Sequence, residues 1–444
     1  MNYVTPKINI NALRIGYYTD KYFLRTQEIL VKDKFQDKVH YQYFPRKDCV
    51  VCGIPQVLQI LKECVGYYSD RERAWKLFNE MQQIDLYDSK STEPDGEFFI
   101  GLKRDLNELW ISKYNDIEVF AIEEGSEVKD MEPVIGIIGN PAWFAHLETP
   151  TLGVLAQQSA VATSVRRALS KLDPSKNLYF FPARFRHYMS QAADGYASVI
   201  AGGKDMSTDA NGEYWGYTGL GTIPHLLIAA YGGDTALAAL KFDEYIDPKV
   251  NRIILVDWDN DCIGTTVECV VAFLRRGKEE PYIPYERNAA EQYLKGSYQP
   301  PEQYLRDYMH QIQEVIGEGK GKIYGVRFDT SGSLWDRSVS KVPGTTGVSP
   351  ELVIKAREKF DSLGLKDLKI MVSGGFDEEK LGLFKKMRVP YDVVGIGSSI
   401  VNKFTVDFTA DAVMLNGKQC AKVGRSLQDW SRMKKDDWFS FQNK

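Results

Sequence analysis

The sequence has little of what marks several broad classes of protein. Its 56 Lys and Arg nearly cancel its 60 Asp and Glu, and a net charge of −4 over 444 residues predicts no binding surface for nucleic acid or an anionic membrane. No apolar run reaches the roughly 18 to 20 residues that a membrane span needs. Residues 1–10 lack the apolar core of a signal peptide. We therefore expect a soluble, cytoplasmic protein in which local basic groups hold any anionic ligand.

Cysteine is scarce as well. The six cysteines are scattered along the chain, so the sequence predicts no disulfide framework. Only Cys49 and Cys52 have the C-x-x-C spacing of a zinc site, and no second Cys or His pair lies at zinc-finger distance. Because Cys49-Val50-Val51-Cys52 has the composition of a strand, we interpret the pair as buried strand cysteines.

Two glycine loops are the most informative feature that is present. Ser373-Gly374-Gly375 follows the strand-like run 369–372, and Gly395-Ile396-Gly397-Ser398-Ser399 follows the run 391–394, with a charged, helix-spaced segment at 378–387 between them. Glycine lets backbone N–H groups approach an anion closely, and two such loops after consecutive parallel strands form the usual phosphate cradle of an α/β barrel. The pair predicts a phosphate-bearing small molecule, although either loop alone is also explained by turn geometry.

The first 140 residues differ from the rest of the chain. Helical spacing at 24–31, 58–61 and 71–81 is followed, from Glu97 to Ile138, by short alternating runs that predict a small β domain. After Pro141, long helices such as Gly153–Leu172 alternate with short apolar runs, which is the pattern of a parallel sheet. The strand candidates are Leu178–Phe181, Ile253–Val256, Ile323–Phe328, Lys369–Val372 and Tyr391–Val394, with helices at 265–276 and 350–363 between some of them.

No dinucleotide-binding G-x-G-x-x-G lies near the first of these strands, so a barrel is favoured over a doubly wound sheet. We predict an α+β accessory domain at 1–140, an α/β-barrel domain at 141–400, and a C-terminal extension at 401–444 that packs back on the accessory domain. The segment Glu279–Gln303, rich in Pro, Tyr and charge, is expected to be an exposed excursion between barrel units.

Polar residues follow the predicted strands, where barrel enzymes keep their sites. Asp257 follows Ile253–Val256, while Arg327 and Asp329 end the next strand. Carboxylates at strand ends suit Mg²⁺, which prefers oxygen ligands; helix N-capping is the alternative. Further upstream, Phe181 and Arg184 suit stacking on a flat ligand and pairing with its anionic group, unless they are a core aromatic beside a surface Arg. His225 begins a helix, where a general-acid role competes with capping.

These segments, in this order, resemble the nicotinate phosphoribosyltransferases along nearly the whole chain. The matching motifs are Thr19-Asp20-Lys21-Tyr22-Phe23, Phe181 to Arg184, Gly221-Thr222-Ile223-Pro224-His225, Val256-Asp257, Arg327-Phe328-Asp329-Thr330, Ser373 to Asp377, Gly395 to Ser399, and Phe408-Thr409-Ala410-Asp411. The resemblance implies an irregular α/β barrel with a β-rich N-terminal accessory domain. It also implies a homodimer that joins nicotinate to phosphoribosyl pyrophosphate, giving nicotinate mononucleotide and pyrophosphate.

The resemblance also assigns roles to residues. Phe181 and Tyr22 would stack on the pyridine ring, with Tyr22 supplied by the neighbouring subunit at a shared active site. Asp329 would bind the ribose hydroxyls and Asp257 the Mg²⁺, with Arg327 and His225 as further catalytic candidates. The remaining substrate-binding candidates are Arg184, Thr222, Ser373, Gly374, Gly375, Gly395, Gly397, Ser398 and Ser399.

Two departures from the family pattern leave questions open. Members that couple the reaction to ATP hydrolysis through a phosphorylated histidine commonly have an acidic residue directly after it, whereas Leu226 follows His225 here, so a need for ATP is undecided. Thr330 replaces the serine of the more widespread R-x-D-S-G-D, which leaves sugar contacts beyond Asp329 undecided. Ile223 stands where nicotinamide-using relatives have an aspartate, and this favours nicotinate. The alternatives are nicotinamide or quinolinate as substrate, or a non-catalytic phosphoribosyl pyrophosphate sensor.

Overall fold

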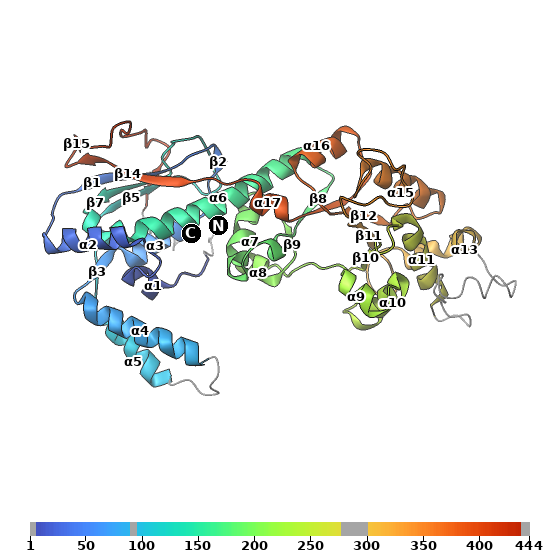
Figure 1. Cartoon of the computed structure of the whole chain (residues 1–444), viewed down its shortest axis with the longest axis horizontal. Coiled ribbons are helices and arrows are strands. Elements are labelled where there is room, and N and C mark those ends of the chain that lie inside the picture. The colour runs from blue at the N-terminus through green and yellow to red at the C-terminus, as the bar shows by residue number, and fades with distance from the viewer. Residues whose placement is uncertain (1–5, 89–95, 277–300, 437–444) are drawn as a thin grey trace.

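The computed structural model describes residues 6–88, 96–276 and 301–436. Two parts, each built around a sheet, are connected by the long helix α6 (Glu148–Lys171), which crosses the centre of Figure 1. The helix begins five residues before the predicted Gly153, because Pro150 lies in its first turn, where proline costs no hydrogen bond. In the described ranges, no helix is both long and apolar enough to cross a membrane.

The second part contains a six-stranded sheet in which every pair of neighbouring strands is parallel. Its strands, in spatial order, are β10 (Ile253–Leu255), β11 (Gly325–Phe328), β12 (Lys369–Val372), β13 (Val393–Ile396), β8 (Asn177–Phe180) and β9 (Asp205–Met206). All five predicted strands are present, with boundaries moved by up to two residues, whereas the short β9 was not predicted. The prediction of a parallel α/β sheet is confirmed. With β10 and β9 at its edges, the sheet seen in the described residues is a half-barrel.

Helices pack against this sheet and share its main core with the strands. The predicted helices at 265–276, 350–363 and 378–387 correspond to α11 (Cys262–Arg275), α15 (Pro350–Ser362) and α16 (Glu378–Lys386). The others are α7 (Gln191–Ile200), α8 (Asp209–Gly212), α9 (His225–Ala230), α10 (Thr235–Tyr245), α13 (Pro301–Asp307), α14 (Ile312–Val315) and α17 (Ser398–Asn402). Most of the predicted excursion at 279–303 lies outside the described residues.

A buried ion pair fixes the start of β10. Arg252 is fully buried, and its Nε donates to Asp243 Oδ1 at 2.7 Å. The rest of its guanidinium donates to carbonyls of the loop between α10 and β10, including those of Asp247 and Ile246. A buried charge is tolerated only when it is paired and hydrogen-bonded. The Arg252 contacts therefore fix the point at which β10 begins, and with it the position of Asp257 after the strand.

The first part contains an antiparallel sheet that uses both ends of the chain. Its strands, in spatial order, are β15 (Lys418–Gln419), β14 (Phe408–Leu415), β1 (Val39–Pro45), β7 (Ile135–Gly139), β5 (Glu118–Ala121) and β16 (Lys434–Lys435). β1 pairs with β14 on one side and β7 on the other, so C-terminal strands complete a sheet begun near the N-terminus. Two small pairs lie beside it: β2 (Cys49–Val50) with β6 (Glu127–Val128), and β3 (Gly66–Tyr68) with β4 (Trp110–Ser112).

The N-terminal region combines helices with strands, and one β prediction is wrong. Residues 96–108, at the start of the predicted β stretch, form α5 (Gly96–Glu108), which packs against α4 (Arg71–Asp88) as a helical hairpin at the lower left of Figure 1. Leu102 and Leu106 lie on one face of α5 and share a small core with Phe78 and Met81 of α4. This region also contains α1 (Ile10–Ile15), α2 (Lys21–Lys32) and α3 (Ile54–Cys64).

Cys49 and Cys52 are buried, as interpreted from the sequence, although only Cys49 lies within a strand. Burial raises the pKa of the Cys49 thiol to about 12, and burial also raises that of Cys52 well above its ordinary value. Thiols in this state are inert at neutral pH. The C-x-x-C spacing therefore has a packing explanation.

Candidate active site

The predicted acidic and basic side chains meet where the parallel strands end. β10 and β11 pair in the register Leu255 to Arg327, and β11 and β12 pair Phe328 to Val372. The residues that follow these pairs therefore lie next to one another at the edge of the sheet where the carboxyl ends of the strands meet. Ser373 Oγ donates to Asp329 Oδ1 at 2.7 Å and to the carbonyl oxygen of Phe328 at 3.1 Å. Register alone thus places Asp329 beside the first glycine loop.

Arg327 lies beside Asp329 and is largely buried. Its Nη1 is 3.8 Å from Asp329 Oδ2. Burial lowers the pKa of Arg327, the carboxylates of Asp329 and Asp257 oppose that shift, and the positive charge of Arg184 adds to it. Arg184 lies on the turn Ala183–Phe185 after β8, near enough for its charge to act on Arg327. Two cations held near each other favour an anionic ligand.

His225 and Asp257 form a second pair at this edge. His225 Nε2 is 3.0 Å from Asp257 Oδ1, and the imidazole is about half exposed whereas the carboxylate is nearly buried. Burial raises the pKa of Asp257, His225 opposes that shift and the Asp329 carboxylate adds to it. His225 begins α9, but its acidic partner comes from the end of β10, while the following Leu226 is 79% exposed.

The two glycine loops present unpaired backbone donors. Gly374 and Gly375 have φ angles of +83° and +70°, in the left-handed region that favours glycine. Within the described chain, the N–H groups of Gly374, Gly375 and Phe376 donate to no acceptor, and neither do those of Ser398 and Ser399. Successive free N–H groups in a turn form a concave site that suits an anion. Because β12 and β13 are neighbours, both loops lie at one edge of the sheet.

Close packing explains why Gly395 and Gly397 are glycines. A Cβ atom on Gly395 would lie 3.0 Å from the Phe181 ring, and one on Gly397 would lie 2.3 Å from the carbonyl oxygen of Phe181. These glycines therefore let the segment after β8 pack closely on β13. Phe181 itself is partly buried against Ile253, Met371 and Val393, on one face of the sheet.

Ile223 and Tyr22 do not join this cluster, for different reasons. Ile223 is fully buried in the core around the sheet, and its N–H donates to the carbonyl oxygen of Ile253 at 3.2 Å. The substrate argument based on Ile223 therefore concerns a buried position, beside the partly buried Thr222. Tyr22 lies on α2 in the other part of the molecule (Figure 1), is 60% exposed, and its hydroxyl contacts Asp20 Oδ2 at 3.4 Å. Within a single chain, Tyr22 and Phe181 therefore do not lie together.

Asp336 supports the site and was missed by the sequence analysis. It is fully buried and accepts from the backbone N–H of Cys262 at 2.8 Å and of Ser338 at 2.9 Å. The neighbouring Arg337 N–H donates to the carbonyl oxygen of Asn260 at 2.6 Å. These bonds hold the loop after β11 against the loop after β10. The spacing of Asp336 and Ser338 could have indicated a turn held by the Asp336 side chain, because an Asp two residues before a Ser is typical of an Asx turn.

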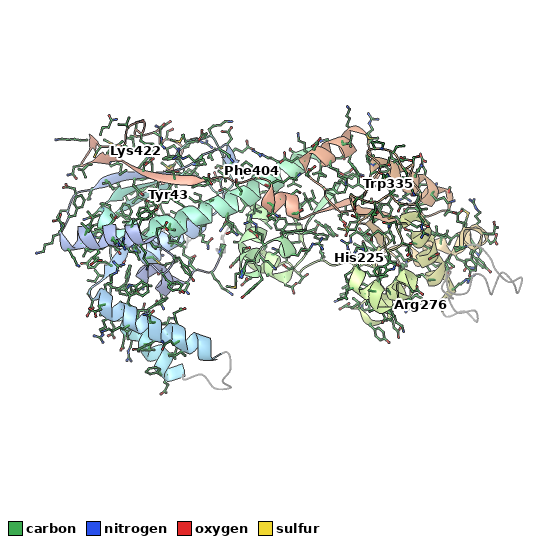
Figure 2. All side chains as sticks on the ribbon, in the orientation of Figure 1. Tyr43, His225, Arg276, Trp335, Phe404 and Lys422 are labelled. Carbon is green, nitrogen blue, oxygen red and sulfur yellow. The ribbon has the colours of Figure 1, made fainter. Side chains whose placement is uncertain are left out.

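The loop held by Asp336 also carries Trp335, which is 38% exposed. Figure 2 shows Trp335 and His225 in the part of the molecule that contains the parallel sheet, whereas Tyr43 lies in the other part. The described residues contain no group of three or more His, Cys, Asp or Glu side chains arranged to hold a metal ion. A metal at this edge would depend on one or two carboxylates together with ligand oxygens.

Comparison with known proteins gives a consistent result, although no protein-family model matches the chain. The chain is 27% identical over 383 residues to human nicotinate phosphoribosyltransferase, which covers 82% of this chain and 65% of that protein. Two crystal structures are similar. Nicotinate-nucleotide pyrophosphorylase from Pyrococcus furiosus has a TM-score of 0.63 and 24% identity, covering 95% of this chain and 81% of that one. Human nicotinic acid phosphoribosyltransferase has a TM-score of 0.54 and 19% identity, covering 92% and 77%.

These comparisons confirm the resemblance found in the motifs, and the similar structures show a shared fold. The chain spans just under two thirds of the length of the human relative that it matches.

Proposed function

We propose that this protein joins nicotinate to phosphoribosyl pyrophosphate, forming nicotinate mononucleotide and releasing pyrophosphate, as in NAD salvage. The observation that carries the proposal is the placement of Asp329 between Arg327 and Ser373, next to a loop of free N–H groups. The similarity to nicotinate phosphoribosyltransferases supports the same assignment.

The reaction suits the residues because it needs charge stabilisation more than a covalent nucleophile. Departure of pyrophosphate from the anomeric carbon leaves positive charge on the ribose ring, and a fixed carboxylate near the ring hydroxyls stabilises that charge. We assign this role to Asp329, which Ser373 Oγ holds at 2.7 Å. Arg327 and Arg184 are proposed to hold phosphate or carboxylate groups of the substrates, and Phe181 and Thr222 to contact the base.

The phosphate of the ribose is proposed to bind at the two glycine loops. The free N–H groups of Gly374, Gly375, Ser398 and Ser399 supply donors without any need to break an existing hydrogen bond. Gly395 and Gly397 contribute by close packing of the backbone, which keeps the second loop beside Phe181. Backbone donors fixed in advance cost little reorganisation when the anion binds.

Asp257 fits a role beside Mg²⁺. Burial and the Asp329 carboxylate raise the pKa of Asp257, and a neighbouring cation would relieve both effects. When bound, Mg²⁺ supplies positive charge to the pyrophosphate group as it leaves. Asp257 would hold the ion as an oxygen ligand, with phosphate oxygens and water completing its coordination.

We further propose a homodimer with shared active sites. Support comes from Tyr22, whose exposed ring lies on α2, away from the cluster of its own chain. A second subunit that placed α2 over the Phe181 segment would put two aromatic faces on either side of the pyridine ring. Comparing turnover with and without ATP tests whether His225 couples ATP hydrolysis to the reaction.

The test is to incubate purified protein with phosphoribosyl pyrophosphate, Mg²⁺ and labelled nicotinate, with and without ATP. Nicotinate mononucleotide and pyrophosphate should appear in equal amounts. Parallel reactions with nicotinamide and with quinolinate should give far less product. Equal use of nicotinamide would overturn the substrate assignment, and binding of phosphoribosyl pyrophosphate without product from any base would favour the sensor alternative.

A further inference from the structure

Lys380 occupies a position that helix stability does not explain. It is the third residue of α16, and its backbone N–H donates to the capping side chain of Asp377 at 2.9 Å. The first turn of a helix is the positive end of its dipole, where acidic residues such as Glu378 and Glu379 are favourable and a lysine is not. A residue that breaks a local rule in this way is a candidate for a functional role.

The side chain of Lys380 turns back onto the first glycine loop. Its Nζ donates to the carbonyl oxygen of Gly374 at 3.2 Å and lies 4.2 Å from the centre of the Phe376 ring. Burial lowers the pKa of Lys380 to about 8, and the Asp377 carboxylate opposes that shift. Asp377 is itself paired with Lys403, so the partly buried Lys380 ammonium shares its nearest carboxylate with a second lysine.

The hydrogen bond to Gly374 fixes the direction of the next amide. In a trans peptide the C=O of one residue and the N–H of the following residue lie in one plane and point in opposite directions. The structure contains no cis peptide in the described residues. Holding the Gly374 carbonyl toward the Lys380 ammonium therefore points the free N–H of Gly375 away from that ammonium.

We propose that Lys380 is a positioning residue of the phosphate site. It orients the Gly374–Gly375 peptide so that the Gly375 N–H faces the phosphate group. It also places a partly buried positive charge behind the loop, and a bound phosphate stabilises that charge. The inference rests on the proposed phosphate-binding role of this loop and assigns a function to a residue that no motif marked.

The test compares Lys380→Met and Lys380→Arg with Lys386→Met, which removes an exposed lysine of the same helix. The readouts are the Kd for phosphoribosyl pyrophosphate by calorimetry and the steady-state constants. Lys380→Met should weaken phosphoribosyl pyrophosphate binding and raise its KM by roughly 10- to 100-fold, the scale of a charge-assisted hydrogen bond. The KM for nicotinate should change less than about twofold. Lys380→Arg should restore part of the loss, and Lys386→Met should resemble wild type.

A pH series separates this role from a purely structural one. Above about pH 8 the wild-type ammonium loses its proton, so affinity for phosphoribosyl pyrophosphate should fall between pH 7.5 and 9.5. Lys380→Arg should show no such fall, because Arg stays charged, and Lys380→Met should be weak at every pH. A folded Lys380→Met protein with wild-type affinity would overturn the inference.

Binding is measured apart from turnover, so the two proposals fail differently. A wild-type protein that binds phosphoribosyl pyrophosphate through Lys380 but makes no mononucleotide refutes the reaction and keeps the inference. A wild-type protein that binds neither phosphoribosyl pyrophosphate nor inorganic phosphate overturns the inference as well.

Discussion

Asp329 is held from two sides, and its value to the proposed reaction depends on that restraint. Ser373 Oγ donates to one carboxylate oxygen at 2.7 Å, and Arg327 lies 3.8 Å from the other. A carboxylate fixed before the substrate arrives spends little free energy on reorientation when the ribose ring gains positive charge.

Replacing Asp329 tests this directly. Asp329→Ala should lower kcat/KM by about 2 to 4 kcal/mol in transition-state free energy, the scale of losing one fixed electrostatic contact. Asp329→Asn keeps the shape and should lose most of the same activity, because the negative charge is what matters. Thermal unfolding of both variants provides the control. Unchanged kcat/KM in a folded Asp329→Ala protein would exclude this role.

At this scale the sequence predicted that several candidate residues lie close together, for a physical reason. Parallel strands end at one edge, so residues such as Asp257 and Asp329 can be brought together by register alone. Lys380 and Asp336 could not be found this way. Their roles depend on which backbone atoms the folded loops place beside them. The Asx-turn spacing marks the turn at Asp336 but not its bond to the Cys262 N–H, and no short pattern marks Lys380.

Helix α2 is attached to the body of the molecule through a buried histidine. Gln27 Nε2 lies 2.8 Å from His146 Nδ1 and 3.1 Å from the carbonyl oxygen of Gly66, while His146 Nε2 lies 3.1 Å from the carbonyl oxygen of Cys64. Thr19 Oγ1 donates to the carbonyl oxygen of His146 at 2.6 Å. The attachment fixes the helix that carries Tyr22.

His146 should make this protein sensitive to acid. Burial lowers the pKa of His146 to about 3, whereas an unfolded histidine has a pKa near 6.5. Below about pH 6.5 the unfolded state therefore binds one more proton, and stability is lost as the pH falls from 6.5 toward 3. By pH 4.5 the loss should reach about 2 to 3 kcal/mol.

Urea unfolding at pH 7.5 and 4.5 measures this loss. His146→Gln should be less stable than wild type at pH 7.5, and the difference should shrink at pH 4.5, because glutamine does not titrate. His310→Gln, at an exposed position, is the matched control and should leave the acid sensitivity unchanged. A constant difference between His146→Gln and wild type at both pH values would show that His146 does not titrate in this way.

Elements were predictable where local pattern decides them. Apolar runs bounded by turns marked the strands of the parallel sheet, but the start of the predicted β stretch at 97–138 lies in α5. Packing of Leu102 and Leu106 against α4 decides that segment. The prediction that the 401–444 extension packs back on the accessory domain did not include the pairing of β1 with β14, because partners such as Tyr43 and Ala410 are far apart in sequence.

The arrangement of the whole molecule separates Tyr22 from the other proposed site residues. Tyr22 lies in the part with the antiparallel sheet, the Asp329 cluster lies in the part with the parallel sheet, and α6 runs between them (Figure 1). If Tyr22 takes part in the reaction, it does so in the site of another subunit. Its own surroundings are compatible with this, because a 60% exposed tyrosine contributes little to a core.

Tyr22→Ala should therefore lower kcat/KM for nicotinate by an amount equivalent to roughly 1 to 3 kcal/mol, the scale of losing one aromatic stack on a flat ring. Thermal stability should be nearly unchanged. Mixing Tyr22→Ala subunits with Asp329→Ala subunits sharpens the test. In a mixed dimer with shared sites, one site contains both defects and the other contains neither. Up to half of the wild-type activity should return per mixed dimer. If subunit exchange is demonstrated and no activity returns, Tyr22 and Asp329 serve the same chain and the shared-site dimer is wrong.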